Sequence, residues 1–269
     1  MMGARDLDQP QERQMDFMFP GIRWACYLLA ASAAQPLSSM AAPAAESGIK
    51  SEQPGQLRHP AVDFDAAGLR EGKFTYQLSI EGKPLGVAII EIRNAGKDEC
   101  TVTFSSKDID QSWRSSFGPR LTPLAATLDM PKGESPYSMS LRYSGKGVSG
   151  TESAKGSSKP VAATFDRQVI DQRVDWAAMM AAEIPNGKSV EFAVYDPGTG
   201  LSRLVGSAAE SKPVGGVLGD LPTTRLDYTI HKEDHTESYS VYATKSKPRI
   251  MLREEMPGGL LSVLVAMEK

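Results

Sequence analysis

Apolar and polar side chains alternate at every second position in one segment after another between residues 74 and 267. In a β-strand, successive side chains point to opposite faces, so this period is typical of strands with one buried face. Turn residues such as Gly82, Gly198 and Gly258 separate the segments. About a dozen short strands in this order predict a mainly β fold, in which a curved antiparallel meander or barrel-like sheet is formed. The strand-like segments are 74–80, 85–92, 137–143, 190–194, 201–206, 226–230, 239–243, 250–252 and 260–267.

One segment, residues 171–183, breaks this period and has the composition of a helix. It is rich in Ala and Met, which are strong helix formers. Ile170, just before the segment, and Val174 and Ala178 within it recur at helical spacing. Trp176 and two adjacent methionines widen the apolar surface to most of the circumference, which is typical of a buried helix. The sequence therefore predicts one central helix, with the curved sheet wrapped around it.

The N-terminal part of the chain has the pattern of a secretory signal peptide. Arg23 precedes a short apolar run, residues 24–34, and the small residues Ser39 and Ala41 flank a methionine. The run is only about half of the roughly 20 apolar residues that a transmembrane helix requires. We therefore expect a signal peptide over residues 1–41, cleaved after Ala41, and a periplasmic or secreted protein.

Alternatives remain open at this end of the chain. The apolar run could be an N-terminal helix of the folded domain, and the true start could be Met1, Met15 or Met18. Residues 42–61 are polar, interrupted by prolines and without periodicity, which indicates a disordered linker. The remaining residues, 62–269, are expected to form a single strand-rich domain.

Charge and cysteine content exclude several classes of protein. Lys and Arg number 30 against 33 Asp and Glu, so the formal net charge is −3. That balance lacks the basic surface that nucleic-acid binding requires. After removal of the signal peptide we expect no transmembrane segment. Of the two cysteines, Cys26 would leave with the signal peptide, and Cys100 begins a strand pattern and is expected to be buried.

Motifs that could carry a cofactor or a metal fail on their context. Gly145, Gly147 and Gly150 spell G-x-G-x-x-G, but no helix pattern follows, so residues 145–159 are predicted to form a flexible surface loop. His231 and His235 are four residues apart at the tip of a predicted hairpin, where a solvated turn is expected. We therefore expect no cofactor, no metal site and no catalytic motif.

A group of charged residues precedes and enters the predicted helix. Charges on a buried helix need partners, so structural ion pairs and helix capping explain the group best. The alternative is that its acids form the paired carboxylates of a hydrolase acting on envelope polymers. The group consists of Asp166, Arg167, Asp171, Arg173 and Asp175.

Several local patterns together resemble the bacterial exported proteins of domain-of-unknown-function family 3108. They are Phe74-x-Tyr76 with Gly86, Asp166-Arg167 with Asp171 before a mid-chain helix, and Pro248-Arg249 with Pro257-Gly258-Gly259 near the end. The resemblance implies a periplasmic protein with a strand-rich curved sheet and without established activity, and it transfers no catalytic residues. The Ala/Met-rich helix and the stretch 145–159 depart from that family.

These observations favour a non-enzymatic protein that binds a hydrophobic ligand, such as a lipid, or an apolar peptide segment of a partner. Strands such as 85–92 are apolar on both faces, and methionines adapt to varied shapes. The expected binding residues are Trp176, Met179, Met180 and Ile90. The alternatives are the envelope-polymer hydrolase and a purely structural envelope module with a filled interior. The ligand and the oligomeric state stay open.

Overall fold

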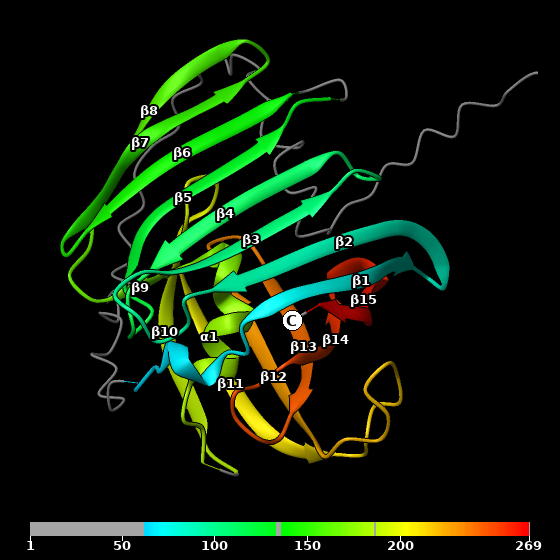
Figure 1. Ribbon diagram of the computed structural model, residues 1–269. Helices are drawn as coiled ribbons and strands as arrows, with labels where there is room; N and C mark the ends of the chain where they lie inside the picture. Colours follow the sequence, from blue (N-terminus) through cyan, green and yellow to red (C-terminus); the bar gives the residue numbers. More distant parts are fainter. Residues whose placement is uncertain (1–61, 133–135, 186, 269) are drawn as a thin grey trace, which may run out of the picture.

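A single large sheet makes up most of the described chain (Figure 1). The computed structural model describes residues 62–132, 136–185 and 187–268, so the predicted signal peptide and linker, 1–41 and 42–61, lie outside it. The strands are β1 (Gly72–Ile80), β2 (Lys83–Arg93), β3 (Cys100–Ser106), β4 (Gln111–Phe117), β5 (Pro123–Met130), β6 (Tyr137–Ser144), β7 (Gly147–Ala154), β8 (Ser157–Thr164), β9 (Val169–Asp171), β10 (Ser189–Asp196), β11 (Gly200–Ser211), β12 (Thr223–His231), β13 (Thr236–Thr244), β14 (Met251–Met256) and β15 (Leu260–Glu268).

The strands form two meanders that join through the first and the last strand. The order across the sheet is β8-β7-β6-β5-β4-β3-β2-β1-β15-β14-β13-β12-β11-β10-β9. Neighbours pair antiparallel, except that β9 and β10 are parallel. The mainly β, antiparallel architecture is therefore confirmed. The predicted barrel-like closure is not confirmed, because the edge strands β8 and β9 do not pair and the sheet stays open.

The helix of the described chain is shorter than the sequence predicts. α1 spans Asp175–Ala181, and all of its residues are buried. The preceding residues form β9 and the 3-10 helix η2 (Gln172–Val174), because Asp171 caps η2 by accepting a hydrogen bond from the backbone of Arg173. Two further 3-10 turns are η1 (Ala66–Gly68) and η3 (Pro257–Gly259). The prediction of a buried helix is confirmed, and its start is corrected from residue 171 to residue 175.

The stretch predicted as a flexible surface loop, residues 145–159, lies mostly in strands β7 and β8. These strands pair in register, with Gly150 opposite Val161. Lys155 and Gly156 both have positive φ at the turn, as a tight two-residue hairpin requires. The prediction was wrong because β7 has small and polar residues at positions where other strands have apolar ones, so no apolar alternation was visible.

The hairpins with clear alternation form as the sequence predicts. β1 and β2 pair around Glu81 and Gly82, which both have positive φ. β12 and β13 pair with Tyr228 opposite Tyr239, and the two rings stack with centroids 5.1 Å apart. Aromatic pairs directly opposite each other contribute to the stability of a sheet, so these contacts fix the register of this hairpin.

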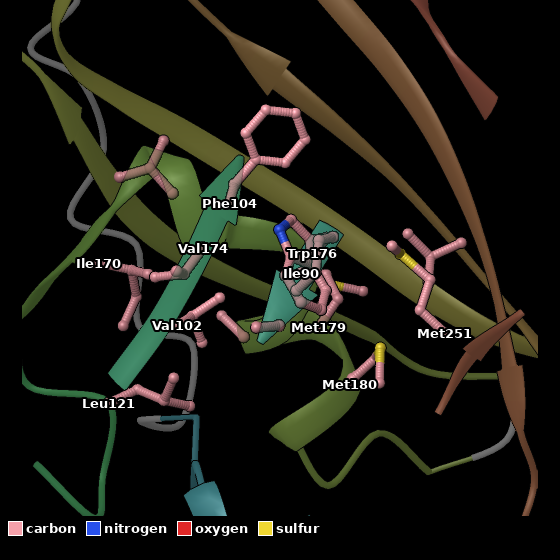
Figure 2. Packing of buried hydrophobic residues seen from close by; sticks show 14 of the residues in the cluster. Ile90, Val102, Phe104, Leu121, Ile170, Val174, Trp176, Met179, Met180 and Met251 are labelled. Atoms are coloured by element: carbon pink, nitrogen blue, oxygen red, sulfur yellow. The ribbon is translucent and has the colours of Figure 1, made fainter. Parts of the chain in front are cut away.

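The core lies between α1 and the inner face of the sheet (Figure 2). Side chains of the helix and of strands from both meanders form one packed cluster. Gly206 of β11 allows close packing here, since a β-carbon at this position would overlap the side chain of Met179. Cys100 is buried in the same cluster, as expected. α1 is therefore held by packing against the sheet rather than by its own length.

Candidate functional site

A partly open cavity of about 60 Å³ lies between α1 and the inner face of the sheet. Its apolar lining comes from both meanders and from the helix, and its polar lining from six further side chains. The apolar residues are Leu78, Ala88, Ile90, Phe104, Trp113, Leu128, Trp176 and Met256. The polar residues are Gln111, Gln172, Arg173, Asp196, Glu254 and Ser262.

The register of β3 and β4 brings two aromatic side chains together in the lining of this cavity. Phe104 on β3 and Trp113 on β4 are directly opposite each other, and their rings stack at a centroid distance of 5.7 Å. Ile90 is opposite Phe104 on the other side, and Leu128 is opposite Trp113. The four side chains thus lie side by side on four adjacent strands, and such cross-strand neighbours stabilise one another.

The polar side of the cavity belongs to a buried cluster that we call the seam: Ser115, Asp171, Arg173 and Asp196. Arg173 pairs with Asp171 and lies 3.5 Å from Asp196. Ser115 of β4 donates a hydrogen bond of 2.7 Å to Asp171 of β9. The seam therefore connects the edge strand β9 to the inner face of β4, where the two strands share no backbone pairing.

Burial governs the ionisation of the seam. Removal from water raises the pKa of Asp171, while Arg173 and the hydrogen bond from Ser115 oppose that rise. Burial also raises the pKa of the nearby Tyr143, with a further contribution from the charge of Asp171. Charged groups in such surroundings are stable only when they are paired. Arg173 supplies the positive charge that this cluster requires.

The four residues predicted to bind a ligand divide into two pairs. Trp176 of α1 and Ile90 of β2 both line the cavity. Met179 and Met180 of α1 are almost completely buried in the core and are not part of the cavity lining. Figure 2 shows the four side chains within the same cluster. The helix thus contributes one face to the cavity and its other residues to packing.

The acidic group before the helix does not form one constellation. Asp166 pairs with its exposed neighbour Arg167, whereas Asp171 belongs to the seam. Asp175 is buried at the start of α1, where it accepts a hydrogen bond of 3.3 Å from Tyr228. The three carboxylates therefore have different partners. Asp171 contacts the cavity-lining residue Arg173 through its side chain, whereas Asp175 accepts a hydrogen bond of 2.5 Å from the backbone N–H of Trp176.

The predicted turn with two histidines adjoins a buried ion pair. Lys232 donates a hydrogen bond of 2.6 Å to Glu237, and the side chains of both are less than a tenth exposed. Tyr239 donates a second hydrogen bond of 2.5 Å to the same carboxylate, and His235 lies 3.2 Å from it. His231 forms hydrogen bonds with the hydroxyl groups of Thr229 and Thr236. The side chains of this cluster thus bind one another.

Sequence patterns missed most of the cavity lining. Trp113 and Phe104 lie in alternating segments, so they could have been assigned to the inner face. Gln172, Asp196 and Glu254 carried no such signal, because polar residues at strand or turn positions usually face water. Gln172 lies in η2 directly before α1, whereas the curvature of the sheet brings Asp196 and Glu254 to the helix.

Neither a metal site nor a membrane-spanning helix is found among residues 62–132, 136–185 and 187–268. In these residues no three His, Cys, Asp or Glu side chains are grouped to hold a metal ion. No helix there combines the length and the apolar character that crossing a bilayer demands. Comparison with known proteins finds no matching family model, no matching curated protein and no matching solved structure.

Proposed function

We propose that the protein is an exported, non-enzymatic binding protein of the bacterial envelope. It takes an apolar group of a ligand or partner segment into the cavity between α1 and the sheet. The observation that carries this proposal is the cavity itself, which is partly open and has eight apolar side chains in its lining. Apolar pockets with a few convergent polar groups are the usual form of binding sites.

The size of the cavity sets the kind of occupant. Sites for drug-sized ligands measure about 300–1,000 Å³, several times the cavity volume of about 60 Å³. The free space suits one apolar side chain or the end of one alkyl chain. Between a whole lipid and an apolar partner segment, we therefore favour the segment, which would place one anchoring side chain beside Trp176 and Ile90.

The proposal includes export to the periplasm and the resemblance to a known family. The order of Arg23, the apolar run 24–34 and the small residues Ser39 and Ala41 supports export. The resemblance to domain-of-unknown-function family 3108 supports a periplasmic protein with a strand-rich curved sheet. Intact-mass measurement of the exported protein tests the address. A mature chain that begins at Ala42 agrees with it, and a mass that retains residues 24–34 overturns it.

Filling the cavity tests the binding function. Ala88→Leu places a larger apolar side chain in the lining, so the binding of fatty acids and of apolar peptides should be lost. Ala162→Leu makes the same change on an exposed position of β8 and should leave binding intact. Isothermal titration calorimetry gives the affinity, and burial of apolar surface should give a negative heat-capacity change.

Two other outcomes would replace this function. If neither fatty acids nor apolar peptides bind the unaltered protein, the protein is a structural envelope module and the cavity is no binding site. If envelope polysaccharide or peptidoglycan is cleaved on incubation with the protein, and Asp171→Asn or Asp196→Asn abolishes cleavage, the protein is a hydrolase. Cleavage is not expected, because Asp171 is engaged by Arg173 and Ser115.

A further inference from the structure

Acidic side chains outnumber basic ones in the cavity lining. One cation, Arg173, stands against two carboxylates, those of Asp196 and Glu254. Arg173 is moreover bound by Asp171 outside the lining. Its positive charge is thus shared between two acids of the seam. An acidic occupant would have to compete with both of them, whereas a cationic occupant would meet more carboxylates than cations and would share Asp196 with Arg173.

A buried hydrogen-bond acceptor also favours an occupant that carries donor groups. Gln172 lines the cavity from η2, and its side-chain oxygen is buried without a hydrogen-bond partner among the described residues. A buried acceptor that lacks a donor is costly. Gln172 can be satisfied by an occupant that carries N–H or O–H groups. Two carboxylates and this amide oxygen thus present acceptors to the same space.

The remaining lining selects the shape of the occupant. Trp176, Ile90 and Ala88 are apolar parts of the lining, and the volume of about 60 Å³ admits only a small group. A lysine side chain combines an unbranched apolar stem with a terminal group of three donors and one positive charge. A guanidinium is planar and larger than an ammonium group, and it is less suited to so small a volume.

We propose that the cavity binds a primary alkylammonium group, with its carbon stem beside Trp176 and its ammonium group between Glu254, Asp196 and Gln172. This inference rests on the proposed function, since it uses the same cavity, and it names the chemistry of the occupant. The group could belong to a lysine of a partner segment or to a free alkylamine.

Three small molecules that share a four-carbon chain and differ in their head group show how much the head group contributes to binding. n-Butylammonium, 1-butanol and butyrate are titrated into the full-length protein. Binding is followed by the indole N–H signals of Trp176 and Trp113 in nuclear magnetic resonance spectra. Hydrogen bonds to charged groups predict that butylammonium binds about tenfold or more tighter than butanol, and butyrate should bind most weakly.

Neighbouring glutamates provide a matched pair of variants. Glu254→Gln removes an inner carboxylate that is 3 % exposed and should reduce the preference for butylammonium over butanol to less than threefold. Glu255→Gln changes the next residue, whose side chain is 40 % exposed and pairs with Arg253, and should preserve the preference. If Glu254→Gln does not fold, Gln172→Leu tests the same acceptor group and should also lower the preference.

A peptide arm identifies the source of the group. An acetylated peptide with one central lysine between Val and Leu residues is compared with the same peptide carrying norleucine in place of lysine. Tighter binding of the lysine peptide than of both butylammonium and the norleucine peptide assigns the site to a partner segment. Binding of butylammonium without binding of the lysine peptide assigns it to a free amine.

The outcomes keep this inference separate from the proposed function. Equal binding of butylammonium and butanol, or a preference for butyrate, overturns the alkylammonium inference and leaves an apolar binding site. If none of the three binds while fatty acids or apolar peptides do, the inference is likewise overturned and the proposed function stands. If no probe of either kind binds, both are overturned.

Discussion

Arg173 and Asp196 meet at the open side of the sheet, with Nη1 of the arginine 3.5 Å from Oδ2 of the aspartate. Their side chains are only 8 % and 12 % exposed. Arg173 also pairs with Asp171 of the edge strand β9, which is bound in turn by Ser115 of β4. This polar seam holds the edge of one meander against the face of the other through side chains, without backbone pairing between β9 and β4.

Loss of the cation should therefore destabilise the fold. Arg173→Met leaves buried carboxylates without their positive partner, and breaking a buried pair in this way costs about 3–5 kcal/mol. The free energy of unfolding in urea measures the effect. Arg167→Met removes an exposed partner of Asp166 and should cost about 0–1 kcal/mol. Similar losses for both variants would show that the seam contributes no special stability.

Trp176 should be among the most sensitive positions of the helix. Its side chain is 4 % exposed and packs between α1 and the sheet, so Trp176→Ala should cost about 3–5 kcal/mol through lost transfer energy and an added cavity. Leu201→Ala, at a residue that is 49 % exposed, should stay within about 0.5 kcal/mol. Chemical denaturation compares the two. A small effect at Trp176 would place α1 on the surface.

Glu237 should make the stability of the protein depend on pH. Burial alone would raise the pKa of Glu237, but hydrogen bonds from Lys232 and Tyr239 outweigh it and hold the pKa below its usual value of 4.5. The charged form is thus favoured by folding. The stability that Glu237 contributes should be complete above about pH 4.5 and should disappear as the pH falls through the lowered pKa.

Two variants test this dependence. The difference in unfolding free energy between the unaltered protein and Glu237→Gln should grow as the pH rises from about 2 to about 5, and then stay level. Lys232→Met removes the cation, so burial should dominate and shift the pKa of Glu237 upward. A difference that is constant over this range would mean that Glu237 has the same pKa in the folded and unfolded chain.

Two glycines of the β6–β7 region should respond in opposite directions to a methyl group. A β-carbon at Gly150 would overlap the backbone carbonyl of Ser140 on the neighbouring strand, so Gly150→Ala should cost about 1–3 kcal/mol. Gly145 faces open space and its φ lies outside the left-handed region. Gly145→Ala should therefore stabilise by about 0.4–1 kcal/mol through the unfolded chain. Thermal unfolding of both variants checks the pair.

The strands that the sequence predicted have an inner face filled by large apolar residues. Phe74, Tyr76, Leu78 and Ile80 all alternate and are all buried in β1. β7 escaped prediction because Val148 is followed at its inner positions by a glycine and a glutamate. Periodicity detects a strand only when one of its faces is apolar. A strand whose buried face consists of small or paired polar residues shows no such alternation.

The site was predictable only in part, for a related reason. Helical spacing and size singled out Trp176, and a doubly apolar strand singled out Ile90. The seam depends on contacts such as that between Ser115 and Asp171, which are 56 residues apart. Such contacts are set by how far the sheet bends, and local patterns contain no measure of that bend.

The position of β1 and β15 at the centre of the sheet has a consequence for synthesis. The first strand pairs with the last along most of its length, from Lys73 with Glu268 to Ile80 with Leu260. Each meander can form its hairpins during synthesis, but their union must wait for β15. A nascent or prematurely terminated chain that stops before residue 260 would expose β1 and β14 as unpaired edges, which invite aggregation. The sheet is therefore protected from such edge pairing only once β15 has been made.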